Sequence, residues 1–209
     1  MCRAAAGALS ASGTGVSVFT DDAVRGVCAA SDPRSERVDE LQFVLGEGPC
    51  VDAFDIRRPV LIADLAAGAT VRWPMYTPAV RENGVRAVFA FPLQVGDARL
   101  GVLDVFRDSA GALSADQFTD ALTFADVTVS ALLEAQKGTG DVGGDDIGDA
   151  AERRAEVFQA QGMVMVQIGG TISDAIARMR AYAYAEGRGL SEVARDVVAG
   201  RLSFDRDRP

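Results

Sequence analysis

Histidine is absent from the sequence, and only three cysteines are present: Cys2, Cys28 and Cys50. Without histidine the chain has no Ser-His-Asp or Cys-His catalytic set and no histidine-ligated haem or metal. The cysteines are widely spaced and form no CxxC pair, which argues against a disulfide framework and against structural zinc. We therefore expect a protein that is not an enzyme and that has no metal site.

A long apolar run is also missing, since none approaches the roughly 20 residues that span a bilayer. The N-terminus, with Arg3 followed by small residues, has too short an apolar core for a secretory signal. The hydrophobic share of 48% and the charged share of 24% are typical of a globular protein. These features predict a cytoplasmic protein without a membrane partner. A length of 209 residues leaves room for one ordinary domain and a small one.

Negative charge dominates the chain, with a net charge of −9, but it is unevenly spread. Residues 1–137 carry 12 basic and 18 acidic side chains, and residues 138–150 carry four aspartates and no base. Residues 151–209 carry nine arginines against eight acids, and no lysine. Arginine presents a planar fork of donors that suits phosphates and base edges. Only this last segment is therefore suited to bind a polyanion.

Glycine and aspartate dominate residues 138–150, and five of the eleven residues from Gly138 to Gly148 are glycine. Such a stretch buries too little apolar surface to offset the entropy of ordering it. We interpret it as a flexible linker. The domain boundaries that follow are 1–137 for the first domain, 151–204 for the second and 205–209 for a tail.

Strand and helix patterns are interleaved in residues 1–137. Strands are predicted at residues 16–20, 25–30, 59–65, 85–95 and 99–107. Helices are predicted at residues 36–45, from Pro49 onward, and from a Ser114–Gln117 capping box to Lys137. Asp21-Asp22 and Gly96-Asp97 provide tight turns between neighbouring strands. This arrangement predicts an α+β domain in which helices flank an antiparallel sheet.

Residues 151–204 show only helical patterns. The first helix is predicted over 152–168, the second from a Thr171–Asp174 cap to Glu186, and the third over 190–198. Three such short helices can bury a common core only as a three-helix bundle. The first helix has a second apolar stripe (Phe158, Met165 and Val166), which we expect to contact a partner subunit or the first domain. The alternative is a helix buried all round. Gly162 in its interior suggests a close approach between helices.

The first region resembles the GAF sensory domain, in its actinobacterial version that precedes an RNA-binding tail. The residues that carry the likeness are LGEGPC at 45–50, Pro59-Val60 before Ala63-Asp64-Leu65, Arg72-Trp73-Pro74, GVRAVFAFPL at 84–93 and RLGVLDVFR at 99–107. The usual first helix of the family is shortened here. The resemblance implies a small-ligand pocket over the sheet, for which the candidates are Cys50, Trp73, Tyr76, Phe89 and Phe91. The sequence does not identify the ligand or any cofactor, and aromatic residues on strands are also common in a plain core.

Cys50 has alternative interpretations, as a redox-sensing thiol or as a buried structural cysteine. No base adjacent in sequence lowers its pKa, which favours the structural role. Asp64 and Asp104 suggest a carboxylate pair, but nothing in the sequence shows that they meet.

The second region resembles the ANTAR domain, a three-helix transcription antitermination module that binds RNA hairpins. The likeness rests on QAQGMVM at 159–165, residues 171–175, Arg178-Met179-Arg180 with Ala183, residues 190–198 and Gly200-Arg201-Leu202. Many family members have lysine where this chain has Gln161. If that position touches phosphate, the electrostatic attraction there is weaker in this chain.

Several side chains of this second region are candidates to contact RNA. Ala177, Ala181 and Tyr184 lie on the outer face of the second helix, where small residues permit close approach and a tyrosine can stack on an unpaired base. The alternative is that alanine is simply the best helix former. The predicted RNA contacts are Gln161, Arg178, Arg180, Tyr184, Arg188 and Arg195.

Together these features predict an RNA-binding transcription antitermination regulator. In this hypothesis the GAF-like domain senses a small ligand or a partner and controls how a homodimer presents its tails to RNA hairpins in nascent transcripts. Part of the apolar stripe at Phe118, Ala121, Leu122, Ala125, Val129 and Leu132 would form the dimer seam. The alternatives are a DNA-binding regulator and a protein-interaction module. The former lacks a basic recognition helix, because Glu192 and Asp196 flank Arg195.

Overall fold

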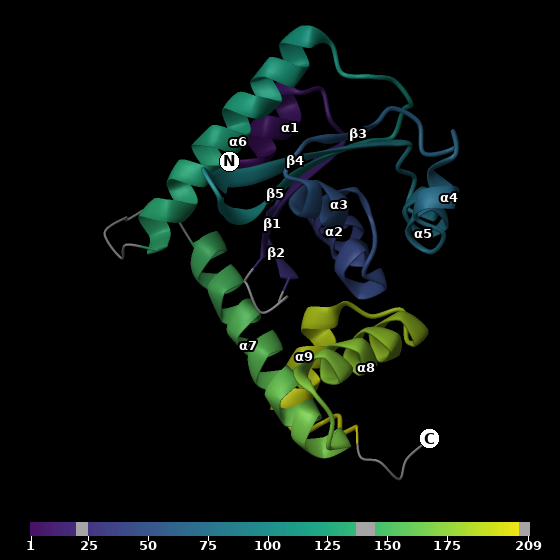
Figure 1. Cartoon of the computed structure of the whole chain (residues 1–209), viewed down its shortest axis with the longest axis vertical. Helices are drawn as coiled ribbons and strands as arrows, with labels where there is room; N and C mark the ends of the chain where they lie inside the picture. Colours follow the sequence, from purple (N-terminus) through teal and green to yellow (C-terminus); the bar gives the residue numbers. More distant parts are fainter. Residues whose placement is uncertain (20–24, 137–144, 205–209) are drawn as a thin grey trace. The chain divides into compact units, whose positions relative to one another are not determined.

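The computed structural model describes residues 1–19, 25–136 and 145–204 (Figure 1). The chain forms two compact units, Met1–Asp146 and Ile147–Pro209. Most of the predicted linker and the turn at Asp21-Asp22 lie outside the described residues. No helix in the described ranges is long and apolar enough to cross a membrane.

An antiparallel sheet of five strands organises the N-terminal unit, in the order β2-β1-β5-β4-β3. The strands are β1 (Gly13–Phe19), β2 (Arg25–Ala30), β3 (Val60–Ile62), β4 (Ala87–Val95) and β5 (Ala98–Arg107). Gly96, at φ 56°, makes the tight turn between β4 and β5. The predicted α+β class and antiparallel sheet are confirmed. The third strand is shorter than expected.

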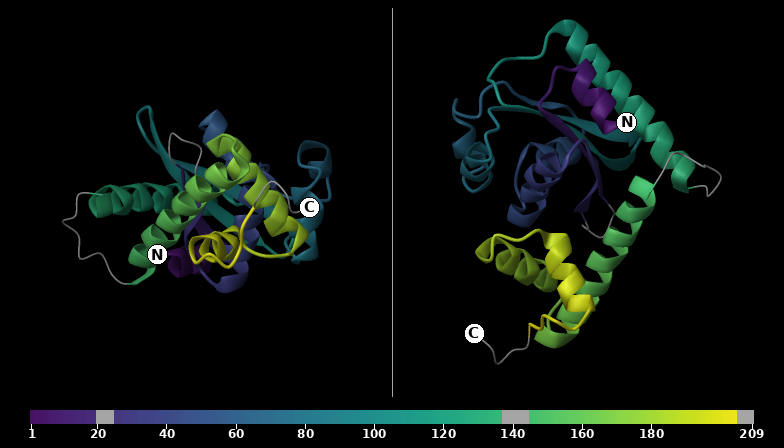
Figure 2. Two further views of the ribbon diagram at one scale, coloured as in Figure 1. Left: turned by 90° about the horizontal axis from the view of Figure 1, so that it is seen from below. Right: turned by 180° about the vertical axis from the view of Figure 1, so that it is seen from behind.

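Helices cover both faces of the sheet (Figure 1, Figure 2). On one face lie α1 (Cys2–Ala8) and α6 (Ala115–Gln136). On the other lie α2 (Pro33–Leu45) and α3 (Pro49–Ile56), followed along the chain by the short helices α4 (Ala69–Arg72) and α5 (Tyr76–Glu82). Sequence patterns did not predict α1, α4 or α5, because each has seven residues or fewer and shows barely two turns of periodicity.

Helix ends in this unit are fixed by capping residues. Pro49 occupies the first turn of α3, as predicted. The Ser114 and Gln117 side chains bond reciprocally to each other's backbone at the start of α6, at 3.2 and 3.0 Å. Asp32 caps α2 by accepting from the amides of Arg34 and Ser35, at 2.9 and 3.0 Å.

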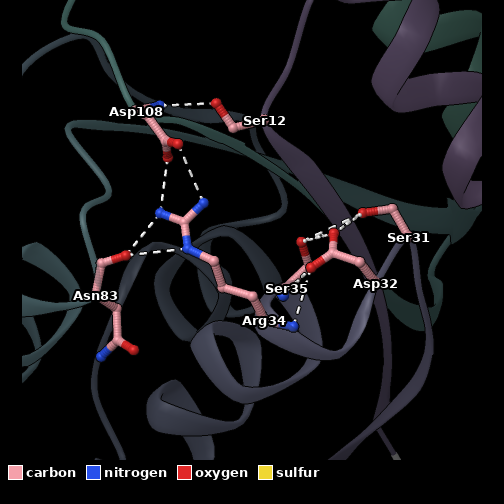
Figure 3. A network of polar contacts seen from close by, with 7 residues as sticks. All are labelled: Ser12, Ser31, Asp32, Arg34, Ser35, Asn83 and Asp108. Atoms are coloured by element: carbon pink, nitrogen blue, oxygen red, sulfur yellow. Dashed lines mark hydrogen bonds and ion pairs between the residues drawn. The ribbon is translucent and has the colours of Figure 1, made fainter.

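Arg34 ties α2 to two other segments (Figure 3). Its guanidinium donates to both carboxylate oxygens of Asp108, at 2.8 and 3.2 Å, just after β5. It also donates to the carbonyl of Asn83, which follows α5, at 2.6 and 3.1 Å. A bidentate arginine–carboxylate pair fixes direction as well as distance. The layer that contains α2 and α5 is therefore held to the end of β5.

The C-terminal unit consists of α7 (Asp145–Ile168), α8 (Ile172–Ala185) and α9 (Leu190–Val198). Helix α7 begins earlier than the predicted Glu152. Thr171 and Asp174 form the predicted capping box at the start of α8. Gly187 and Gly200, at φ 61° and 69°, follow α8 and α9 in the left-handed conformation that ends a helix. The buried side chains of this unit come from all three helices and from Phe204: Val157, Ala160, Gln161, Val164, Ala175, Met179, Ala183, Leu190, Val193, Ala194 and Val197. The predicted all-helical region is confirmed.

Candidate functional site

A cluster of buried polar side chains lies in the N-terminal unit, between the sheet and helices α2 and α3. Asp39 of α2 accepts from the Ser17 hydroxyl of β1 at 2.8 Å and from the Gln42 amide at 3.1 Å. The Gln42 side-chain oxygen in turn accepts from the Cys50 backbone N–H at 2.7 Å. A Cβ at Gly15 would lie 2.4 Å from Asp39 Oδ2, so only glycine leaves room for this carboxylate beside β1.

Asp104 and Cys50 complete this cluster. One carboxylate oxygen of Asp39, one of Asp104 and the Cys50 sulfur all lie within 4.8 Å of one another. All three residues are fully buried. Burial raises the pKa of Asp39 to about 6. Burial, together with the negative charge of Asp39, raises the pKa of Asp104 well above its ordinary value.

Tyr76 and Trp73 border the same cluster. Their rings meet edge to face, with centroids 6.5 Å apart. The Tyr76 hydroxyl and the Trp73 indole N–H are buried, and neither has a hydrogen-bond partner in the part of the chain that the structure describes. Burial, and then the negative charges of Asp104, Asp39 and Cys50, raise the pKa of Tyr76 well above 10. Three of the five predicted pocket residues, Cys50, Trp73 and Tyr76, therefore lie in one layer.

Phe89 and Phe91 lie on the opposite face of the sheet, so the prediction that all five residues line one pocket is wrong. Phe91 packs against Phe118 of α6, with ring centroids 5.8 Å apart. Phe89 lies under the guanidinium of Arg107, which donates to the Leu9 carbonyl after α1. Side chains alternate along a strand, and it is Val88 and Ala90 that join the core containing Cys50.

A hollow of about 440 Å³ opens on the C-terminal unit beside α8. Its lining comprises Arg178, Ala181, Tyr182, Arg201, Leu202, Ser203 and Phe204. A second hollow, of about 500 Å³, adjoins it, since Arg178, Ala181 and Phe204 line both. Tyr182 meets Phe204 edge to face with centroids 5.4 Å apart, and the Phe204 amide donates to the Gln167 side chain at 2.9 Å. The segment after α9 is thereby held against α7 and α8.

Arg178 and Tyr184 are exposed on the outer face of α8, as the helical wheel predicted. Tyr184 is 51% exposed, and Ala177 and Ala181 are exposed near it. Among the described residues, Arg178 forms no ion pair or hydrogen bond, so its guanidinium is available to an anion. Arg180 is half-buried. The structure therefore brings Arg178, but not Arg180, to the open hollow.

Arg188 and Arg195 both bind acids of their own unit. Arg188 pairs with Asp196 at 2.6 Å and lies 3.9 Å from Glu192, while Arg195 lies 3.7 Å from Glu156. Asp196 also accepts from Arg201 at 2.7 Å. These hydrogen bonds, first from Arg188 and then from Arg201, lower the pKa of Asp196. Any RNA contact by these arginines exchanges an internal partner for phosphate.

Gln161 is only 2% exposed, so the prediction that it contacts RNA is wrong for this arrangement of the helices. It occupies the i+4 position of the stripe formed by Val157, Ala160 and Val164, which faces the core. Gly162 also differs from expectation, because a Cβ there would meet nothing within 4 Å. Close packing within the described chain therefore does not explain that glycine.

Arg201 and Phe204 belong to the hollow but were missed as site residues. They follow the last helix, where periodicity gives no information on side-chain direction. The available signal was the Gly200-Arg201 pair, in which a helix-ending glycine places an arginine directly beside the bundle.

Family comparisons assign both units. A GAF domain model matches residues 1–132. The chain belongs to the GAF family. An ANTAR domain model matches residues 145–198, so a GAF unit precedes an ANTAR unit. Both are regulatory domains rather than enzymatic ones: GAF domains are sensory, and the ANTAR match supports an RNA-binding transcription antitermination regulator.

Solved structures support the fold of the GAF unit. A domain of a sensor histidine kinase-type protein from Sinorhizobium meliloti 1021 is 18% identical, covers 65% of this chain and 88% of its own, and has a TM-score of 0.52. The GAF domain of the cyanobacteriochrome TePixJ is 23% identical, with coverages of 64% and 84% and a TM-score of 0.50. At these identities the likeness shows the fold alone. No curated protein matches the chain.

Proposed function

We propose that this protein binds hairpins in nascent RNA through its ANTAR unit and that its GAF unit controls the binding in response to a small ligand or a partner. The observation that carries the proposal is the ANTAR match over residues 145–198, on a unit whose surface has an open hollow lined by arginine. A role on nascent transcripts puts the protein in the cytoplasm.

The hollow has the chemistry that a folded RNA requires. Arg178 offers a guanidinium that is unpaired among the described residues, and Ala181 lets a phosphate backbone approach α8 closely. Tyr184, exposed on the same helix, presents an aromatic face on which an unpaired base of a loop can stack. Arginine and an aromatic ring on a surface of small residues fit a hairpin loop better than a regular duplex.

A homodimer is part of the proposal, because exposed apolar side chains occur on both units. Leu122 of α6 is 40% exposed, and Phe158 and Val166 of α7 are 38% and 75% exposed. Of the other residues in the α6 stripe, Ala121, Ala125 and Val129 are buried, and Phe118 and Leu132 are partly buried. A second copy that covers these side chains would pair two ANTAR units. Sedimentation of the purified chain tests this part, and a monomer at all accessible concentrations would refute it.

RNA binding is tested with the full-length chain and a labelled pair of hairpins in a filter assay at low and moderate salt. We expect binding that weakens steeply with salt and is competed by unlabelled hairpin RNA but not by duplex DNA of equal length. Equal competition by duplex DNA would support a DNA-binding regulator instead. A protein partner retained after nuclease treatment in high salt, with no hairpin binding at low salt, would support a protein-interaction module.

A further inference from the structure

The buried cluster of the GAF unit concentrates acidic groups without a counter-charge. Among the described residues, no lysine or arginine forms an ion pair with Asp39 or Asp104. Within residues 1–19, 25–136 and 145–204, neither carboxylate oxygen of Asp104 has a hydrogen-bond partner of ordinary geometry. Buried carboxylates are normally paired, hydrogen-bonded or bound to a metal. The hydrogen bonds from Ser17 and Gln42 offset the cost of burying the Asp39 carboxylate. The cost of burying the Asp104 carboxylate is not offset in this way.

We propose that Asp39, Cys50 and Asp104 bind one divalent transition-metal ion, with the Tyr76 hydroxyl as a further donor. The three ligand atoms already lie within 4.8 Å of one another. The Tyr76 hydroxyl is an independent indication, because it is fully buried in the same core as Cys50 and has no hydrogen-bond partner among the described residues. The metal site deepens the sensory role proposed above. The site is argued from the buried cluster, and only its part in sensing rests on the proposed function.

The donor set selects the kind of metal. Carboxylates and a thiolate together suit zinc or a similar first-row divalent ion, whereas magnesium and calcium prefer oxygen ligands only. Two carboxylates and a thiolate would carry three negative charges, of which a divalent ion neutralises two. The metal would thus supply the positive charge that the cluster lacks.

The surroundings hold two of the proposed ligands in place. Gln42 bonds to Asp39 through its amide and to the Cys50 backbone through its carbonyl oxygen, so one side chain orients the segments that carry both ligands. The ligands come from α2, from the first turn of α3 and from β5. An ion bound here would therefore connect the sheet to the helices that cover it.

The test is the metal content of the full-length chain, purified after growth with added zinc, iron or cobalt. We expect about one ion per chain for one of these metals, and a thiolate-to-cobalt charge-transfer band when cobalt is added to the chelator-treated protein. Asp104→Asn and Cys50→Ser should each lower the retained metal at least tenfold. Cys28→Ser, which alters a buried cysteine outside the cluster, should retain it.

Trp73 fluorescence and hairpin-RNA binding of each variant show whether the units remain folded, and they separate this proposal from RNA binding. Wild-type protein with no stoichiometric metal under any of the three conditions and no cobalt–thiolate band would overturn the proposal. Folded Asp104→Asn and Cys50→Ser variants with unchanged metal content would overturn it equally. A metal-binding protein that does not bind RNA would refute the proposed function and leave the metal site standing.

Discussion

Asp39 of α2 and Asp104 of β5 lie side by side in the interior of the GAF unit, both fully buried. Gly15, which pairs with Asp104 across the sheet, leaves the space that Asp39 occupies. Ser17 and Gln42 donate hydrogen bonds to Asp39, whereas Asp104 receives none of ordinary geometry from the described residues. The pair costs folding free energy unless a cation or a shared proton offsets its charge.

Asp104→Asn should therefore stabilise the GAF unit of the chelator-treated protein by about 1–2 kcal/mol, because an amide carries no charge and can donate to Asp39. Trp73 is the only tryptophan in the chain, so its fluorescence during urea unfolding follows this unit. Asp97→Asn changes a fully exposed carboxylate and should leave the midpoint unchanged. A lower midpoint for Asp104→Asn would show that Asp104 stabilises the metal-free fold.

Arg178→Ala should weaken hairpin-RNA binding about tenfold at moderate salt and reduce the slope of log affinity against log salt by about one. The reason is the loss of one phosphate contact from the hollow beside α8. The matched control is Arg57→Ala, which removes the same charge from the GAF unit and should not alter either quantity. Equal effects of the two variants would mean that net charge, rather than a located contact, drives binding.

Tyr184→Ala should weaken binding to a hairpin with an unpaired loop by about 1–3 kcal/mol, the range for one stacked base. The side chain is 51% exposed, so stability should change little. Tyr184→Phe keeps the aromatic face and should bind nearly as well as the wild type. If phenylalanine and alanine are equally weak, the hydroxyl rather than the ring makes the contact.

Asp196 should make the ANTAR unit sensitive to acid. Hydrogen bonds from Arg188 and Arg201 lower the pKa of Asp196 below its ordinary 3.8, so the folded unit binds the proton less readily than the unfolded chain. The stabilisation is therefore fully present above about pH 4 and is lost as the pH falls through the folded pKa. In thermal melts by circular dichroism, Asp196→Asn should melt lower than the wild type at pH 7, and the difference should shrink at pH 3. A constant difference would contradict this assignment.

Thr171→Ala should destabilise the ANTAR unit by about 0.5–2 kcal/mol, because it removes the side-chain oxygen that caps α8. Thr171→Ser preserves the capping oxygen and serves as the control. The relevant transition is the loss of helix signal without a change in Trp73 fluorescence. No difference between the alanine and serine variants would show that the cap contributes nothing.

Local signals in the sequence were sufficient for most of the fold. The Ser114–Gln117 pair and the Thr171–Asp174 box each mark a helix start through hydrogen bonds over three residues, and Pro49 marks one through its fixed φ and its missing N–H; all three are present. Two apolar runs joined by the Gly96-Asp97 turn likewise located β4 and β5. These features depend on neighbours in sequence, so one sequence can reveal them.

The buried cluster could not be predicted in the same way. Asp39, Cys50 and Asp104 come from separate elements and meet only through the register of β1 with β5 and the placement of α2 and α3. Phe89 and Phe91 could not be placed for the same reason. The sequence shows that their side chains lie on one face of the strand, but not whether that face packs against Cys50. The burial of Gln161 could have been predicted from the sequence. It lies four residues after Val157 and therefore on the same helix face as the core stripe.

The ion pairs on the ANTAR unit also bear on how it selects among transcripts. Arg188, Arg195 and Arg201 are each close to an acid of the same bundle, so part of their positive charge is already neutralised before any RNA binds. In the proposed complex, an unstructured strand that makes few other contacts would gain little from arginines that are already paired. Under the proposed function, the acids that pair with these arginines would disfavour bulk cellular RNA.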